Sequence, residues 1–226
     1  GPEGIGLYQM AYSYYGLVLT LITFGLPTAL SFTSIQDSVR RWSLLKHSAI
    51  FLLCVGCVSG FLTFYFSHFI INIFGDAHLL WAIQALAPAL VVVPMLSLLR
   101  GYLQGLEYYT LIAISEVIEQ LIRVCVMLVC VFFWLHYGMD FAIGGATLAA
   151  SISAIFTLAF LFYFLHKINE SHIYNAKKYS EPNKHFLQSS FFILLTQLIT
   201  PTAAFLSTII IPSRLTETGM TIHQAI

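Results

Sequence analysis

Long uncharged stretches alternate with short charged clusters along most of the chain. The intervals without Asp, Glu, Lys or Arg cover residues 4–36, 47–75, 77–99, 124–139, 141–166 and 185–213. A helix that crosses the roughly 30 Å hydrocarbon core of a bilayer needs about 20 mainly apolar residues. The pattern therefore predicts six transmembrane helices, the fourth of which must begin near Thr110 to be long enough.

The fourth predicted helix carries charge at membrane depth. Glu116, Glu119, Gln120 and Arg123 follow the i, i+3, i+4, i+7 spacing, so they share one helix face. An ionisable group at the bilayer centre costs about 2.5–3.5 kcal/mol on the gentlest scale, and it normally faces a bundle interior or a wet cavity. We expect this face to line a substrate or ion cavity; the alternative is a salt bridge that only ties helices together.

The basic residues predict the orientation of the chain, because cytoplasmic loops accumulate Lys and Arg. Eight of the ten basic residues fall on one side of the predicted spans, in or beside segments 37–47, 100–109 and 167–184. Arg214 lies on the other side, and Arg123 lies within a span. These three loops are therefore expected to be cytoplasmic, so that the odd-numbered spans run inward.

The longest polar connection predicts a boundary between two lobes. Residues 167–184 read KINESHIYNAKKYSEPNK and are expected to form a cytoplasmic linker. The predicted domains are an N-terminal lobe over 1–166 and the first helix of a second lobe over 185–226. Contact of the linker lysines with anionic lipid is the weaker reading, because Glu170 and Glu181 are interspersed with them.

Prolines and small residues predict bends and close helix contacts. Pro27, Pro88, Pro94 and Pro201 lie within apolar stretches, and a proline frees a backbone carbonyl and bends a helix. Small residues four apart let membrane helices approach closely. Such residues are Gly56 and Gly60, Gly101 and Gly105, and the series Ala142, Ala146, Ala150, Ala154.

The composition agrees with an integral membrane protein and argues against other classes of protein. The 226 residues are 58% hydrophobic and 9% charged with zero net charge, whereas soluble domains carry about 25% charged residues. Neither nucleic-acid binding nor a metal site is predicted, and the sequence has no catalytic nucleophile motif. Cys54 and Cys57 form C-x-x-C without further ligands, so we interpret them, with Cys125 and Cys130, as small packing residues.

Several segments together resemble a known transporter family. They are GPEGIGLYQMAYSYYGLVLTLITFGLPTALS, LLRGYLQGL, ISEVIEQLIRV and IIIPSRLTETG, in this order and spacing. In these residues the chain resembles the polysaccharide-exporter and lipid II flippase branch of the multidrug/oligosaccharidyl-lipid/polysaccharide superfamily, and especially the group related to stage V sporulation protein B. The resemblance covers nearly the whole chain, and RGYLQG and EQLIRV are its most specific parts.

The resemblance implies an all-α polytopic bundle that is a fragment of a transporter about twice as long. The chain would supply helices two to six of the N-terminal lobe, without the first helix, and begin the second lobe. It would export a lipid-linked oligosaccharide or wall precursor across a bacterial plasma membrane by alternating access. Arg100 and Gln104 would shape the cytoplasmic gate, while Glu116, Glu119, Gln120 and Arg123 would line the cavity or lock its inward-closed state.

The chain departs from the expected pattern, and two other functions stay open. Flippases of this branch are thought to hold pyrophosphate with several cavity arginines, whereas here Arg123 is accompanied by Glu116 and Glu119. One alternative is a multidrug exporter coupled to protons or sodium through these glutamates. The other is a nontransporting scaffold for wall-synthesis enzymes. The expected partners are a lipid-linked sugar, membrane lipids and wall-synthesis enzymes, with no bound cofactor.

Overall fold

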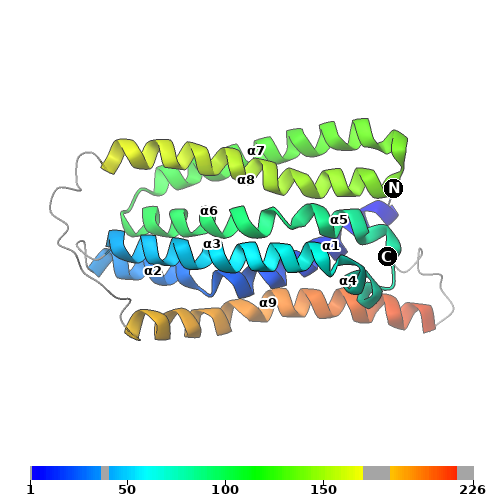
Figure 1. Ribbon diagram of the computed structural model, residues 1–226, viewed down its shortest axis with the longest axis horizontal. Helices are drawn as coiled ribbons and strands as arrows, with labels where there is room; N and C mark the ends of the chain where they lie inside the picture. Colours follow the sequence, from blue (N-terminus) through cyan, green and yellow to red (C-terminus); the bar gives the residue numbers. More distant parts are fainter. Residues whose placement is uncertain (1, 37–40, 170–183, 218–226) are drawn as a thin grey trace.

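In the computed structural model, long helices lie side by side along one axis (Figure 1). The structure describes residues 2–36, 41–169 and 184–217. The elements in chain order are α1 (Pro2–Thr23), α2 (Leu26–Gln36), α3 (Arg41–Tyr65), α4 (Ser67–Phe74), η1 (Ala77–Leu79), α5 (Leu80–Leu86), α6 (Ala89–Gly105), α7 (Tyr109–Trp134), η2 (Leu135–Tyr137), α8 (Met139–Asn169) and α9 (Lys184–Glu217). The predicted all-α polytopic bundle is confirmed.

The predicted number of spans agrees with the helices of the structure. Within the described residues, α3, α7, α8 and α9 are each long and apolar enough to cross a membrane. Two bent pairs, α1 with α2 and α5 with α6, raise this number to six if each pair is one span. The chain is therefore a multi-pass membrane protein. The fourth span begins at Tyr109, one residue before the predicted start.

The two bent pairs have different local causes. The first pair bends by 42° where Phe24 and Gly25 adopt φ of 51° and 65°, a left-handed conformation that ends α1. Pro27 then occupies the first turn of α2, where a missing amide hydrogen costs little. The second pair bends by 43° at Ala87 and Pro88. Helices α6 and α9 continue through Pro94 and Pro201, so kinks there stay predictions.

The predicted small-residue contacts are made between helices. A Cβ on Gly56 would lie 2.8 Å from the carbonyl oxygen of Leu90, and one on Gly60 would lie 2.8 Å from that of Ala87. A Cβ on Gly101 would lie 2.2 Å from the Pro27 carbonyl oxygen, so α6 meets the start of α2 backbone to backbone. The alanines 142, 146, 150 and 154 of α8 are all buried.

Helix α8 is held between two neighbours by adjacent glycines that face opposite ways. Gly144 lies against Trp81 of α5, where an added Cβ would be 3.0 Å from the Trp81 Cβ. Gly145 lies against Trp134 of α7, where an added Cβ would be 2.5 Å from the Trp134 ring. Accordingly, 44% of the most apolar window of α8 is buried, against 6% for α7 and for α9.

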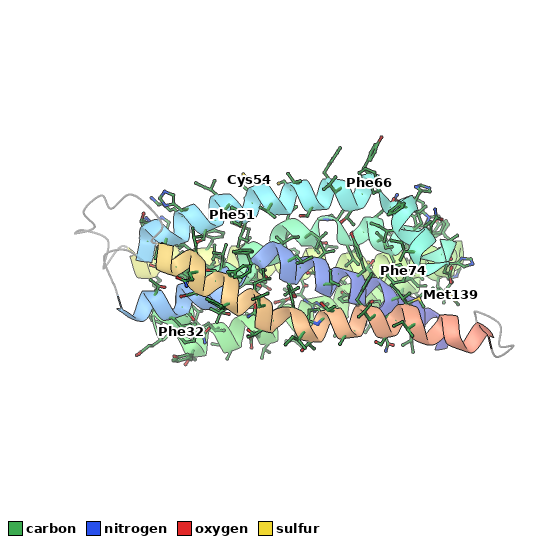
Figure 2. All side chains as sticks on the ribbon, turned by 90° about the horizontal axis from the view of Figure 1, so that it is seen from below. Phe32, Phe51, Cys54, Phe66, Phe74 and Met139 are labelled. Atoms are coloured by element: carbon green, nitrogen blue, oxygen red, sulfur yellow. The ribbon has the colours of Figure 1, made fainter. Side chains whose placement is uncertain are left out.

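Large apolar side chains cover the outer surface, as a bilayer requires. Phe51 and Cys54 of α3, both labelled in Figure 2, are examples of exposed side chains on this surface. Cys54, Cys57 and Cys125 are exposed and Cys130 is half-buried. Interpreting the cysteines as packing residues is thus wrong for the three exposed ones. The pattern could not separate the two cases, because a thiol suits acyl chains as well as a protein core.

Parts of the predicted domain organisation lie outside the described residues. These parts are residues 37–40 of the first predicted loop, residues 170–183 of the linker and residues 218–226. Helix α9 packs along α1 and α2, and Gln197 Nε2 donates to Thr28 Oγ1 at 3.2 Å. Assignment of α9 to a second lobe stays a prediction.

Candidate functional site

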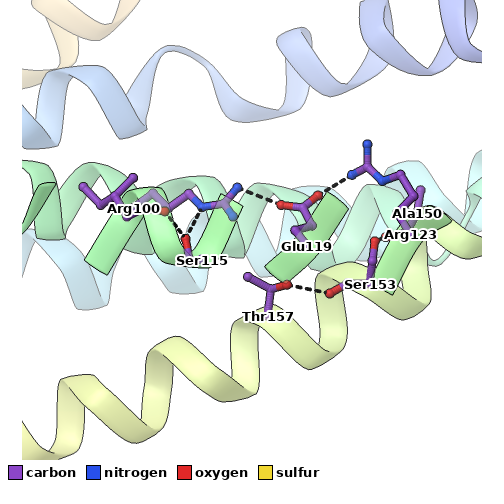
Figure 3. Close-up of polar contacts among 8 residues, drawn as sticks. Arg100, Ser115, Glu119, Arg123, Ala150, Ser153 and Thr157 are labelled. Atoms are coloured by element: carbon purple, nitrogen blue, oxygen red, sulfur yellow. Dashed lines mark hydrogen bonds and ion pairs between the residues drawn. The ribbon is translucent and has the colours of Figure 1, made fainter. Parts of the chain in front are cut away.

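Three charged side chains from two helices meet at membrane depth (Figure 3). Glu119 of α7 is buried, with its side chain 6% exposed. Its Oε2 accepts from Arg100 Nη1 of α6 at 2.8 Å, and its Oε1 accepts from Arg123 Nη2. We call Arg100, Glu119 and Arg123 the charge triad. A single carboxylate thus joins two guanidinium groups and links α6 to α7.

Local sequence explains how the triad is positioned. Arg123 follows Glu119 by four residues, so both side chains lie on one face of α7. Arg100 reaches from α6 and is oriented by Ser115, whose Oγ accepts from Arg100 Nε at 3.0 Å. The Ser115 hydroxyl in turn donates to the Ile112 carbonyl oxygen at 2.7 Å, which fixes its acceptor direction.

The triad carries one net positive charge and unused donors. Two guanidinium groups face one carboxylate, and both Arg100 Nη2 and Arg123 Nε are buried without a hydrogen-bond partner among the described residues. Buried polar groups are normally paired, and a charge-assisted partner is the strongest kind for arginine. The triad is therefore suited to accept an additional anionic oxygen.

Helix α8 presents hydroxyl groups near the triad without competing for its charges. Ser153 and Thr157 are fully buried. Their hydroxyls donate to backbone carbonyls of α8 itself, to Ala150 at 3.1 Å and to Ser153 at 2.8 Å (Figure 3). Because both hydroxyls already donate hydrogen bonds within α8, they do not compete for the two arginines. The charged partner of the arginines is therefore the carboxylate of Glu119.

A row of three tyrosines lies along α1, two of them near Arg123, and this row was not predicted. The rings of Tyr8 and Tyr12 lie 4.4 Å apart between centroids, and those of Tyr12 and Tyr15 lie 5.7 Å apart. Arg123 lies within electrostatic range of the Tyr12 and Tyr15 hydroxyls. The signal was available, because positions 8, 12 and 15 follow the i, i+4, i+7 spacing in an apolar helix.

A hollow of about 470 Å³ adjoins the triad at the end of α6. We call it the polar hollow, and it brings together the predicted residues Arg100, Gln104 and Glu116. Its other lining residues come from α2, α6 and the start of α7 and are Pro27, Thr28, Ser97, Gly101, Tyr109, Ile112 and Ala113. Arg100 belongs to both features, so the hollow leads directly to the triad.

The four residues of the predicted charged face lie in two different environments. Glu119 and Arg123 lie inside with Arg100, as the salt-bridge reading requires. Glu116 and Gln120 are exposed, and Glu116 lines the polar hollow without an ion pair to any described residue. The contact of Arg100 with Glu119 was missed, since the sequence placed Arg100 at a gate. The predicted functional roles of these five residues and of Gln104 stay predictions.

No group of three or more His, Cys, Asp or Glu that could hold a metal ion occurs among the described residues. A histidine and a carboxylate do meet at the opposite end from the polar hollow, where His78 Nδ1 lies 2.7 Å from Asp140 Oδ1. Both side chains are more than a third exposed. This pair joins η1 to α8 and lies apart from the triad.

Comparison with known proteins identifies the family. Residues 1–221 match the family model described as "Polysaccharide biosynthesis protein". The chain is 30% identical to "Stage V sporulation protein B" of Bacillus subtilis (strain 168) over 84% of the chain and 36% of that protein. It is 30% identical to "Lipid II flippase MurJ" of the same organism, over 74% of the chain and 34% of the relative.

A third relative from the same organism is an "Uncharacterized membrane protein YabM", 32% identical over 76% of the chain and 33% of its own length. No solved structure matches the chain. The chain spans about a third of the length of the curated relatives it matches. With a family model matched over nearly its whole length, the chain belongs to the polysaccharide biosynthesis protein family, in the branch that includes lipid II flippase.

Proposed function

We propose that the chain is part of a flippase that moves a lipid-linked oligosaccharide or wall precursor outward across a bacterial plasma membrane by alternating access. The observation that carries this proposal is the charge triad, which places excess positive charge and unpaired guanidinium nitrogens at membrane depth. Lipid does not solvate such charge, so it indicates a substrate or ion path. The name of the lipid II flippase supports the substrate class.

In this proposal the substrate phosphate supplies the acceptors that the triad lacks. Arg100 faces both the polar hollow and Glu119, so an anion entering the hollow would meet Arg100 first. Glu119 keeps both guanidinium groups ordered before binding, which lowers the entropy cost of capture. Bidentate pairing of guanidinium with phosphate oxygens makes arginine suited to this contact.

The proposed orientation places the polar hollow at the cytoplasmic side. Segments 37–47, 100–109 and 167–184 carry the basic residues and would lie in the cytoplasm. Arg100 and Gln104 would then control entry, whereas Arg123 lies deeper in the membrane. Proton or sodium coupling and contact with wall-synthesis enzymes belong to the same proposal. The protein would act as a transporter and not as an enzyme.

Replacing Arg123 by Ala in the complete protein tests the proposal. Loss of a hydrogen bond to a charged group costs about 1.5–3 kcal/mol, so we expect export to slow by roughly tenfold or more. The readout is the appearance of labelled lipid-linked precursor on the outer face of membrane vesicles. Lys46→Ala is the control, because Lys46 lies exposed on α3 over the Trp42 ring. Unchanged export by the Arg123 variant at normal expression would remove Arg123 from the mechanism.

One observation favours a cation-coupled multidrug exporter as second candidate. Glu116 is exposed in the polar hollow without an ion pair to a described residue, so its carboxyl group is accessible to a coupling ion that enters the hollow. Glu119 is unsuited to that role because Arg100 and Arg123 already occupy its two carboxylate oxygens. Drug efflux that depends on Glu116, with no transport of lipid-linked sugar, would favour this candidate over the flippase.

A further inference from the structure

A pocket of about 340 Å³ lies at the end of the bundle where α7 leads into α8, away from the polar hollow (Figure 1). Its volume is within the range of about 300–1,000 Å³ typical of small-molecule sites. Aromatic side chains from α3, α5, α7, η2 and α8 line it, and they are Phe64, Trp81, Trp134, Tyr137 and Phe141. We call it the aromatic pocket.

Close contacts hold the walls of the aromatic pocket in place. An added Cβ on Gly144 would lie 3.0 Å from the Trp81 Cβ, and one on Gly145 would lie 2.5 Å from the Trp134 ring. The rings of Trp81 and Phe141 lie 5.0 Å apart between centroids. The pocket is therefore formed before a ligand arrives, which lowers the entropy cost of binding.

The aromatic pocket lies at the depth where a span meets water. Tyr137 is the last residue of one candidate span, and Met139 is the first residue of the next. Tryptophan and tyrosine are enriched at this membrane–water interface. Because Trp81 and Phe141 are 47% and 40% exposed, the pocket is accessible from the surrounding bilayer. Its position therefore suits the head group of an amphiphile whose chain extends into the membrane.

The ring faces of the aromatic pocket favour a positive charge. The face of an aromatic ring carries the negative part of its quadrupole and attracts a cation within about 6 Å of the centroid. The described residues that line the pocket are all uncharged, so none of them supplies that cation. At the other end of the bundle, by contrast, Lys46 Nζ lies 5.2 Å from the centre of the Trp42 ring.

The polar groups at the aromatic pocket agree with a cationic ligand. Gln84, which also lines it, donates from Nε2 to Ser67 Oγ at 3.0 Å, and its carbonyl oxygen accepts no hydrogen bond from a described residue. Asp140 precedes Phe141 but does not line the pocket, and its Oδ1 lies 2.7 Å from His78 Nδ1. The pocket thus offers partial negative charge to a ligand, which attracts a cation and repels an anion.

We infer that the aromatic pocket binds the head group of an amphiphile that carries an alkylammonium cation. The ammonium lies among the ring faces, and the alkyl chain leaves the pocket toward the bilayer. This site is separate from the charge triad, and it does not depend on the proposed function.

Two probes of the same shape test the site on the complete protein in lipid nanodiscs. One is decyltrimethylammonium, and the other is the same chain ending in a tert-butyl group, which has no charge. After subtraction of the partition into empty nanodiscs, we expect the cation to bind at least about tenfold more tightly than the neutral probe. Trp81→Leu should lower binding of the cation about fivefold, because it removes one ring face.

Fluorinated tryptophans separate the charge of the rings from their shape. Each added fluorine withdraws electron density from the ring face and changes the volume little. Fluorination at Trp81 or Trp134 should therefore weaken binding of the cation stepwise and leave binding of the neutral probe unchanged. Trp42 is the matched control, because it lies at the other end of the bundle beside Lys46.

The outcomes decide between a cationic head group and other occupants. Stepwise loss of cation binding confined to positions 81 and 134 would support the inference. Equal binding of the two probes would overturn it, by showing that an apolar chain fills the aromatic pocket. Cation binding that is insensitive to fluorination at both positions, or that falls equally on fluorination at position 42, would also overturn it. Arg123→Ala should bind the cation normally, which separates this site from the proposed transport path.

Discussion

At the residue scale, the triad depends on one carboxylate that serves two cations. Glu119 accepts from Arg100 and Arg123 through different oxygens, and its side chain is more deeply buried than either arginine. Removal of the Glu119 carboxylate would leave two guanidinium groups close together with no negative charge to compensate theirs. Removal of either arginine would leave one complete pair. Glu119 is therefore the residue on which the structure of the triad depends most.

We predict that Glu119→Gln destabilises the complete protein by about 2 kcal/mol. This value lies between the average of about 0.6 kcal/mol for hydrogen bonds between membrane helices and the cost of about 3–5 kcal/mol for breaking a buried ion pair in a soluble protein. Reversible unfolding in mild detergent measures the effect. Glu116→Gln removes the same charge from an exposed position and should stay within about 0.5 kcal/mol of the parent. Equal effects of the two variants would contradict the assigned role of Glu119.

At the element scale, the fold depends on backbone contacts at glycines as well as on apolar burial. Gly101 lets α6 reach the first turn of α2, and Gly56 and Gly60 let α3 approach the bend between α5 and α6. Both bends are thereby held by a neighbouring helix. The bent spans are fixed parts of the bundle, because each break has a packed partner that opposes straightening.

Gly101→Ala should destabilise the bundle, whereas Gly16→Ala should not. An alanine at 101 would place its Cβ 2.2 Å from a backbone oxygen of Pro27, and overpacking of this kind costs about 1–3 kcal/mol. Gly16 lies in α1 with nothing within 4 Å of an added Cβ, so alanine there should stabilise by up to about 1 kcal/mol. Thermal unfolding of the two variants should shift in opposite directions. A neutral Gly101→Ala variant would show that α2 and α6 are not in tight contact.

The elements could be predicted from the sequence to a greater extent than the site. Uncharged intervals are sufficient to locate the spans, because lipid excludes charge from most of a crossing helix. The contact between Arg100 and Glu119 depends on how α6 and α7 are aligned with each other, and the pattern of either helix alone does not contain this register. The position of the α1 tyrosines near the site was not predicted, because aromatic rings at this spacing are equally typical of an apolar core.

At the scale of the whole molecule, the polar hollow and the triad form one series along the bundle. The polar hollow reaches Arg100, and the triad joins Arg100 to Arg123. Helix α7 contributes to both, yet only 6% of its most apolar window is buried. If the predicted second lobe or a ligand binds this part of the protein, the uncovered face of α7 is where we expect it.

Cysteine scanning of α7 tests whether water reaches this series. In a background without the four native cysteines, cysteines at positions 116 and 120 should react with a water-soluble thiol reagent, because both side chains are exposed on the charged face. A cysteine at 119 should be protected, since that position is buried. Leu121 is exposed but apolar and serves as the control for a lipid-facing position. Uniform inaccessibility at 116, 119, 120 and 123 in every state would support the nontransporting scaffold.

The adjacent glycines of α8 limit which parts of the bundle can move during transport. With Trp81 against Gly144 and Trp134 against Gly145, α8 cannot rotate about its own axis without driving an indole ring into a backbone. The end of the bundle where α5, α7 and α8 meet would then move as one rigid unit. Any change of access would then be accommodated away from this unit.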